Sequence, residues 1–250
     1  MLAFLGLLAL IYIALCAFLF FTQRSMIYLP RPRTVIGGST MLTLPVDGAE
    51  VLVTTLPQAG AKALVYFGGN AEDVAYGLPS LAAAFPDHSI YLMHYRGYGG
   101  SSGEPTEAAL FSDAVALFDK VHAEHQSILV VGRSLGSGVA TYLASVRPVT
   151  RLVLVTPYDS LESVASKHYS LFPVRWLMLD KFESWRYAEH VTAPTLIIAA
   201  QFDEVIPATN TKALLAHFRP ELASMKVIAG TSHNSISESA DYLPVLKGER

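Results

Sequence analysis

The chain has 250 residues, of which 52% are hydrophobic and 16% charged, and its mean hydropathy is +0.37. Soluble proteins average about 25% charged residues, so part of this chain is expected to avoid water. The formal charge of −3 and the lack of a dense Lys/Arg run exclude a basic nucleic-acid-binding protein, and the single cysteine excludes an intrachain disulfide or a multi-cysteine metal site.

The excess hydrophobicity lies at the N-terminus, where residues 2–21 carry no charge. A helix of about 20 apolar residues spans the ~30 Å hydrocarbon layer of a bilayer. The competing interpretation is a cleaved signal peptide, which has a basic start, a shorter apolar region and small residues at its cleavage site. Here no basic residue precedes the run, and its end at residues 18–21 is bulky. We therefore predict an uncleaved single-pass membrane anchor over residues 1–23, with Cys16 facing lipid.

A short basic segment follows the predicted anchor. Arg24, Arg31 and Arg33 lie in residues 24–39, which we interpret as a juxtamembrane linker. Positive charge beside a membrane span favours the cytoplasmic side. The domain over residues 40–250 is therefore expected in the cytoplasm.

The rest of the chain predicts a series of short strands separated by helices. The first two strands flank Asp47-Gly48, which is typical of a hairpin turn. The later strands are nearly continuous runs of Val, Ile, Leu and Tyr, as expected for strands covered on both faces. The eight predicted strands are 40–46, 50–56, 63–67, 90–94, 128–131, 152–155, 195–199 and 225–228.

Helices are predicted between these strands. In the second helix the apolar residues recur at spacings of three and four, which indicates one buried face; they are Ala108, Phe111, Val115, Phe118 and His122. The predicted helices are 71–85, 106–124, 135–146 and 209–218. Alternation of this kind predicts an α/β fold, a mostly parallel eight-stranded sheet with helices on both faces, and residues 159–191 interrupt it as a small cap insertion.

A candidate nucleophile follows the fifth predicted strand. Residues 132–136 read Gly-Arg-Ser-Leu-Gly, and in a G-x-S-x-G elbow the serine lies on a strained strand-to-helix turn with its hydroxyl exposed. The simplest alternative is a glycine-rich turn with a capping serine. The position between a buried strand and a helix favours Ser134 as a nucleophile.

A serine nucleophile needs a base, and the base needs a group that orients it. Among the eight histidines, His233 follows the last predicted strand in a loop of small residues, whereas His94 ends a strand and is better suited to lining a site. Asp203, just after the seventh strand, is the preferred carboxylate, and Glu204 and Asp159 are the alternatives. The chain order serine, acid, histidine is that of one known enzyme fold.

An oxyanion-binding site is predicted at the end of the third strand. Gly68 and Gly69 follow that strand and allow backbone N–H groups to approach a ligand. The donors would be the amide of Leu135 and that of Asn70, or that of Gly69 if the register is one residue earlier. A phosphate-binding loop is the rival interpretation, but no Gly-Lys-Ser/Thr follows and no G-x-G-x-x-G opens a helix.

Taken together, these motifs carry a family resemblance over residues 40–243. The matching stretches are Phe-Gly-Gly-Asn-Ala-Glu at 67–72, Tyr-Arg-Gly-Tyr-Gly at 95–99, Gly-Glu-Pro-Thr at 103–106, Gly-Arg-Ser-Leu-Gly-Ser-Gly at 132–138, Asp-Glu-Val-Ile-Pro at 203–207 and Ser-His at 232–233. The chain resembles the α/β-hydrolase superfamily and, more narrowly, its membrane-anchored ABHD-type serine hydrolases, which Met-Ile-Tyr-Leu-Pro at 26–30 also matches. The resemblance implies Ser134 as nucleophile, Asp203 as orienting acid, His233 as base and the amides of Asn70 and Leu135 as oxyanion donors. It implies no cofactor and no metal.

Two positions depart from the pattern of that branch. Gly68 stands where the branch usually has a histidine, and His94 stands where it usually has an aspartate. The first departure bears on the shape of the oxyanion loop and the second on a supporting hydrogen bond. Neither affects the three predicted catalytic side chains.

The predicted reaction is hydrolysis of a carboxylic ester or thioester through an acyl-enzyme. The anchor makes lipid-derived esters, lysophospholipids and acylated proteins candidate substrates, and no nucleic-acid partner is expected. The apolar side chains of residues 159–191 predict an acyl pocket or lid near the bilayer, or a cap packed on the body of the domain. A serine peptidase of the same fold is the alternative, and a non-catalytic membrane-tethered scaffold is less favoured.

Overall fold

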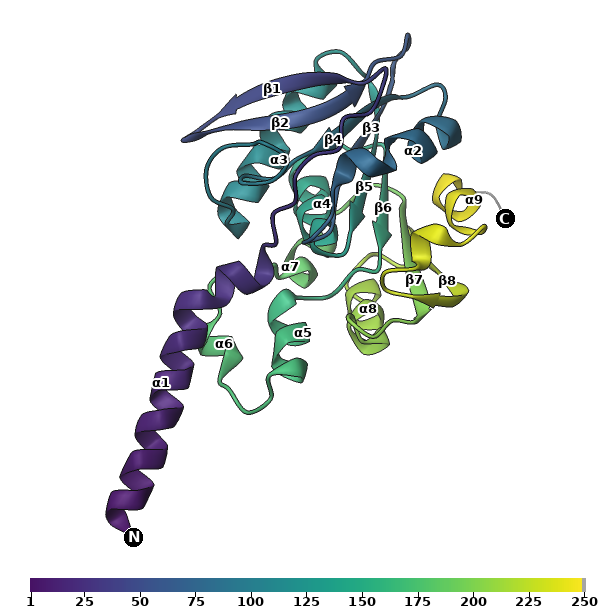
Figure 1. Cartoon of the computed structure of the whole chain (residues 1–250). Helices are drawn as coiled ribbons and strands as arrows, with labels where there is room; N and C mark the ends of the chain where they lie inside the picture. Colours follow the sequence, from purple (N-terminus) through teal and green to yellow (C-terminus); the bar gives the residue numbers. More distant parts are fainter. Residues whose placement is uncertain (249–250) are drawn as a thin grey trace.

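An eight-stranded sheet lies between two layers of helices, and one long helix projects from the body (Figure 1), in a computed structural model that describes residues 1–248. The spatial order of the strands is β1-β2-β4-β3-β5-β6-β7-β8. Their bounds are β1 Thr40–Val46, β2 Ala49–Leu56, β3 Lys62–Phe67, β4 Ser89–Met93, β5 Ser127–Arg133, β6 Arg151–Val155, β7 Thr195–Phe202 and β8 Ala223–Ser232.

The helices alternate with the strands from β3 onward. Their bounds are α1 Leu2–Ile27, α2 Leu78–Ala84, α3 Glu107–His122, α4 Leu135–Val146, α5 Leu161–His168, α6 Val174–Leu177, α7 Ser184–Ala188, α8 Ala208–Leu215 and α9 Tyr242–Lys247. Two short 3₁₀ helices, η1 Val74–Gly77 and η2 Ile236–Glu238, complete the described elements.

The sheet is mixed, with its parallel part in the middle and on one side. Strands β1 and β2 form the predicted hairpin, and β2 is also antiparallel to β4. All other neighbouring pairs are parallel. Phe67 of β3 pairs with Gly132 of β5, so these two strands end side by side. The loop after β3 and the turn after β5 therefore meet at one edge of the sheet, where ligands of such sheets bind.

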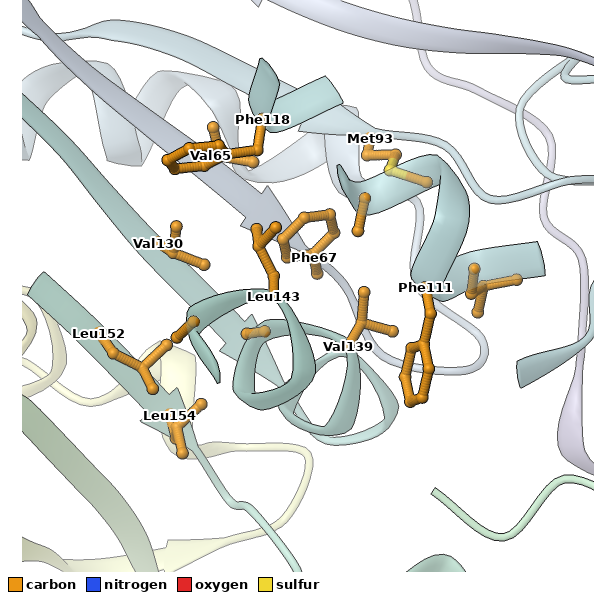
Figure 2. Packing of buried hydrophobic residues seen from close by; sticks show 14 of the residues in the cluster. Val65, Phe67, Met93, Phe111, Phe118, Val130, Val139, Leu143, Leu152 and Leu154 are labelled. Carbon is orange, nitrogen blue, oxygen red and sulfur yellow. The ribbon is translucent and has the colours of Figure 1, made fainter. Parts of the chain in front are cut away.

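Side chains of the central strands alternate between two hydrophobic layers. In β3, Val65 and Phe67 face the layer with α3 and α4, while Leu64 and Tyr66 face the layer with α2 and α9. Figure 2 shows Phe67 and Val130 near Leu143 of α4, and Val65 near Phe118 of α3. Burying one large aliphatic or aromatic side chain stabilises a fold by about 1.5–3 kcal/mol. Both faces of the sheet are covered, which confirms the predicted fold class.

Two predicted helices differ from the structure. The stretch predicted at 71–85 begins as the short η1 and becomes α-helical only at Leu78. In α3 the buried face contains Leu110, Ala114, Leu117 and Val121 in addition to Phe111 and Phe118. Ala108 and His122 are exposed, and Val115 is only partly buried against the core. The predicted face was therefore centred about one residue too far along the helix, because Phe111 and Phe118 belong to both the predicted and the observed face and do not distinguish them.

Three short helices occupy the long interruption between β6 and β7. These helices, α5, α6 and α7, lie below the sheet in Figure 1, with α6 beside the projecting helix α1. Phe182 is fully buried, while Leu171 and Trp176 are 83% and 84% exposed. The insertion therefore packs on the body at one end and presents apolar side chains at the other.

The helix α1 is, within residues 1–248, the single helix long and apolar enough to cross a membrane by length and composition. It extends to Ile27, beyond the predicted end of the anchor at residue 23. None of its residues is buried. Tyr28, the next residue, is buried in the core of the domain.

A buried ion pair ties α3 to the loop after β4. Arg96 donates two hydrogen bonds, of 2.8 and 2.7 Å, to Asp113, whose side chain is fully buried. Substitution Arg96→Met leaves this carboxylate buried without its partner, and we expect it to lower the free energy of unfolding by about 3–5 kcal/mol. Denaturant unfolding followed by tryptophan fluorescence measures the change.

The matched control is Arg147→Met. Arg147 also makes two hydrogen bonds to one carboxylate, that of Asp119, but its side chain is 34% exposed and that of Asp119 is 51% exposed. Exposed pairs contribute only about 0–1 kcal/mol. Equal losses in the two variants would contradict the expected role of burial.

Candidate active site

The turn after β5 holds Ser134 in a strained backbone conformation. Its φ is 48° and its ψ is −116°, a region that non-glycine residues rarely occupy. Two glycines make the turn possible, because a Cβ on Gly136 would overlap the carbonyl oxygen of Phe67, and a Cβ on Gly132 would overlap that of Gly136. The backbone of α4 thus starts directly against the end of β3. This packing leaves the Ser134 hydroxyl at the edge of the sheet.

Three side chains predicted to act together form one chain of hydrogen bonds. The Nε2 atom of His233 lies 2.9 Å from Oγ of Ser134. Its Nδ1 atom lies 3.0 Å from both carboxylate oxygens of Asp203. The side chains of His233 and Asp203 are 6% and 7% exposed. The residues come from the ends of β5, β7 and β8, which the parallel sheet aligns.

The hydrogen bonds decide where the imidazole proton lies. A carboxylate only accepts hydrogen bonds, so Nδ1 of a neutral His233 must carry the proton that faces Asp203. The lone pair of Nε2 then points at the Ser134 hydroxyl and can accept its proton. Asp203 is itself fixed, because its Oδ1 accepts the backbone N–H groups of Val205 and Ile206 at 3.0 and 2.7 Å.

The two alternative carboxylates serve elsewhere. Glu204 accepts a hydrogen bond from the backbone N–H of His233 at 3.2 Å and does not contact the ring nitrogens. Asp159 accepts a hydrogen bond from the side-chain amide of Asn210 at 2.7 Å. Of the three candidates, Asp203 is the one that the structure brings to the imidazole.

The loop after β3 lies against Ser134 and bears on the choice of oxyanion donors. A Cβ built on Gly69 would lie 3.6 Å from that of Ser134. The Gly69 amide donates to Oε2 of Glu72 at 2.7 Å. In the described part of the chain, the amides of Asn70 and Leu135 donate to no protein acceptor. Of the two registers that the sequence left open, this geometry favours Asn70.

An ion pair beside the site escaped the sequence analysis. Arg133 donates to Glu72 at 3.0 Å and to the backbone carbonyl of His233 at 3.3 Å. Glu72 also accepts a hydrogen bond from the Tyr66 hydroxyl at 2.7 Å. The pair therefore links three segments: the loop that carries Asn70, the turn that carries Ser134 and the loop that carries His233. Arg133 occupies one of the two variable positions of the G-x-S-x-G pattern, so the pattern itself gave no signal for this role.

A cavity of about 950 Å³ opens beside Ser134 and His233. It reaches the upper end of the size range of small-molecule sites. Its walls come from Asn70 and Leu135, from the cap helices α5 and α6, and from α1. His168 of α5 lines it, whereas His94 does not. Within residues 1–248 no cluster of three or more His, Cys, Asp or Glu side chains is arranged to hold a metal ion.

His94 lies beneath the loop of residues 95–99 and not in the cavity. Its Nε2 shares a hydrogen bond of 2.8 Å with the Thr54 hydroxyl. A Cβ on Gly99, whose φ is +59°, would overlap the imidazole. The prediction that His94 lines the site is therefore wrong, because its backbone turns the ring back onto β2.

Burial lowers the pKa of His94 to about 4, with a smaller contribution from the positive charge of Arg33 against the opposing charge of Asp73. The unfolded chain has the ordinary value of about 6.5, so below that pH the unfolded state binds a proton that the folded state does not. Stability is therefore expected to fall as the pH drops from about 6.5 to 4, by up to ~1.4 kcal/mol per pH unit. Denaturant unfolding at several pH values should show this slope, and His94→Gln should lack it. Identical slopes in the two proteins would contradict the assignment.

Two comparisons with known proteins identify the fold. The sequence profile of the α/β hydrolase fold matches residues 62–177. The structure of an esterase from Pyrococcus furiosus superimposes with a TM-score of 0.71 over 88% of this chain and 96% of that one, at 14% sequence identity. At this identity the likeness shows the fold alone, which is the α/β-hydrolase fold.

Relatives by sequence extend over most of the chain. An uncharacterized protein of Mycobacterium tuberculosis is 34% identical, over 90% of this chain and 85% of that protein. The lysophosphatidylserine lipase ABHD12 of Xenopus tropicalis is 31% identical over 63% of this chain, and the match spans 46% of that lipase. The chain belongs to the α/β-hydrolase family as an ABHD-type member.

Proposed function

We propose that this α/β hydrolase is a membrane-anchored serine hydrolase that cleaves carboxylic ester or thioester bonds of lipid-like acyl substrates. The observation that carries the proposal is the hydrogen-bonded chain from Ser134 through His233 to Asp203. The cavity beside it and the esterase and lipase named among the similar proteins support an ester substrate.

In the proposed reaction His233 removes the Ser134 proton as the hydroxyl oxygen attacks the ester carbonyl. The amides of Asn70 and Leu135 hold the tetrahedral oxyanion; one such donor is worth about 3 kcal/mol in the transition state. His233 then gives its proton to the leaving alcohol, and the acyl group stays on Ser134. Water, activated by the same imidazole, attacks the acyl-enzyme and releases the carboxylic acid.

We further propose the division into an anchor at residues 1–23, a linker at 24–39 and a hydrolase domain from residue 40 with a cap at 159–191. The uncharged start of α1 supports the anchor. The arginines after it favour a cytoplasmic domain. Protease digestion of sealed membrane vesicles of known orientation tests which side of the membrane holds the domain. Fragments of the domain should appear when the cytoplasmic face of the vesicles is outside, and not when it is inside.

A fluorophosphonate probe tests the catalytic proposal. The full-length protein in detergent micelles is treated with the probe, and the modified peptide is identified by mass spectrometry. We expect one adduct, on Ser134, in folded protein and none after heat denaturation. An adduct on another serine, or no adduct on folded protein, would refute the proposed nucleophile. Turnover of p-nitrophenyl esters without turnover of peptide anilides would separate an esterase from a peptidase.

A further inference from the structure

One wall of the cavity beside Ser134 is formed by α1. Leu19, Gln23, Met26 and Ile27 line it, and their spacings of four, three and one residues place them on one face of the helix. None of these residues belongs to the hydrolase domain as the sequence divides it. The helix predicted as an anchor is therefore also in contact with the space next to the nucleophile.

The opposite wall comes from the cap. Val164, Ala165 and His168 line the cavity from one face of α5, whereas Leu177 of α6 lines it next to α1. Most of the side chains that line the cavity are aliphatic or aromatic. The cavity is therefore a largely apolar space bordered by α1 and by the cap, with Ser134 in its lining.

Polar contacts hold α1 against the cap. The Gln23 side chain donates to the carbonyl of Leu177 at 3.1 Å and accepts from the amide of Leu179 at 2.7 Å. Arg24 forms an ion pair of 3.0 Å with Asp180, whose side chain is 6% exposed. These contacts use both the donor and the acceptor of the Gln23 amide. They fix the rotation of α1 that turns Leu19 and Met26 toward the cavity.

A second contact lies further along α1. Tyr12 stacks on Phe172 and donates a hydrogen bond of 3.0 Å to the carbonyl of Leu171. Tyr12 and Gln23 are 11 positions apart in the sequence, which corresponds to ~16 Å along a helix. The cap thus runs beside the uncharged part of α1, as Figure 1 shows for α6. Leu171 and Trp176, which are 83% and 84% exposed, extend the apolar surface there.

The end of α1 is also attached to the loop that carries Asn70. The backbone N–H of Leu29 lies 3.1 Å from the carbonyl of Asn70 and 2.7 Å from the Tyr98 hydroxyl. The same hydroxyl donates to the Asn70 carbonyl at 2.6 Å. The segment of residues 19–29 therefore contacts both the cap and the loop that carries Asn70.

We propose that α1 is part of the acyl-binding site: the acyl chain of a membrane lipid ester lies between α1 and the cap, with its carbonyl at Ser134 and its tail directed along α1 toward the bilayer. This inference rests on the proposed function of Ser134. In it Leu19, Met26 and Val164 determine specificity for long acyl chains. A long-chain ester in the same bilayer reaches the nucleophile along an apolar path.

The first test compares chain lengths in protein reconstituted into phosphatidylcholine vesicles. Leu19→Trp fills the wall that α1 contributes, so turnover of a palmitoyl ester should fall at least ~10-fold while that of a butyryl ester stays within about twofold. The matched control is Leu10→Trp, because Leu10 is 65% exposed and lies on the opposite face of α1. It should leave both rates unchanged. Equal loss of both esters in Leu19→Trp, or loss of neither, would overturn the proposal.

The second test needs no substitution. A long-chain alkyl fluorophosphonate with a photoreactive group at the end of its chain is bound to the wild-type protein in vesicles and irradiated. Mass spectrometry should find cross-links to residues of α1 and of α5. An adduct on Ser134 without any cross-link to α1 would overturn this inference and leave the proposed function intact, whereas the absence of an adduct on Ser134 would refute the proposed function itself.

Discussion

Replacing Ser134 by alanine is expected to lower kcat for ester hydrolysis by about 10⁶-fold, as in other enzymes that lose a serine nucleophile. The hydroxyl that His233 activates is the atom to which the acyl group would be attached, so no acyl-enzyme can form without it. The backbone turn and the cavity remain, and KM should change little. Steady-state kinetics on a p-nitrophenyl ester, with the full-length protein in micelles, measures the loss.

Ser145→Ala is the matched control for that experiment. Ser145 lies on α4, the helix that follows Ser134, and its hydroxyl donates to the carbonyl of Tyr142. It should retain the activity of the wild type. A residual activity of Ser134→Ala close to that of Ser145→Ala would mean that hydrolysis proceeds without Ser134.

The second large effect is expected from Asp203→Asn, with a loss in kcat of about 10⁴-fold. An asparagine amide can donate a hydrogen bond to Nδ1 of His233, which favours the tautomer with its proton on Nε2. That nitrogen then cannot accept the Ser134 proton. The shape and volume of the side chain are nearly unchanged, so the folded structure should be retained, as circular dichroism can verify.

Glu204→Gln separates the role of Asp203 from a general effect of negative charge. Glu204 is the neighbouring residue and accepts a hydrogen bond from the backbone of His233 without contacting its ring. We expect less than a tenfold loss in kcat for this variant, since the tautomer of His233 stays the same. If Glu204→Gln lost as much activity as Asp203→Asn, the orienting role would not belong to Asp203 alone.

The fold and the candidate catalytic side chains were predictable because both depend on local patterns. Strands covered on both faces leave continuous apolar runs, and the helix predicted at 135–146 agrees with α4. Residues that follow parallel strands gather at one edge of the sheet. Ser134, Asp203 and His233 could therefore be chosen by their positions after β5, β7 and β8, although they are far apart in the chain.

The walls of the cavity were not predictable in the same way. Leu19 and Gln23 lie more than 100 positions before the cap residues that they face, and in an apolar helix no periodicity marks one face as different. The role of Glu72 depends on an ion pair with Arg133, 61 positions further along the chain, which the pairing of β3 with β5 brings close. Long-range contacts of this kind leave no local pattern.

The attachment of Leu29 to Asn70 and the place of Leu19 in the cavity have a practical consequence for work on this protein. A form trimmed of its first 30 or so residues to make purification easier would lack the side chains of Leu19, Gln23 and Met26 that line the cavity. Substrate preferences and inhibitor potencies measured on such a form would describe a site without the surface that α1 contributes. Screens for selective inhibitors should therefore use the intact polypeptide in nanodiscs.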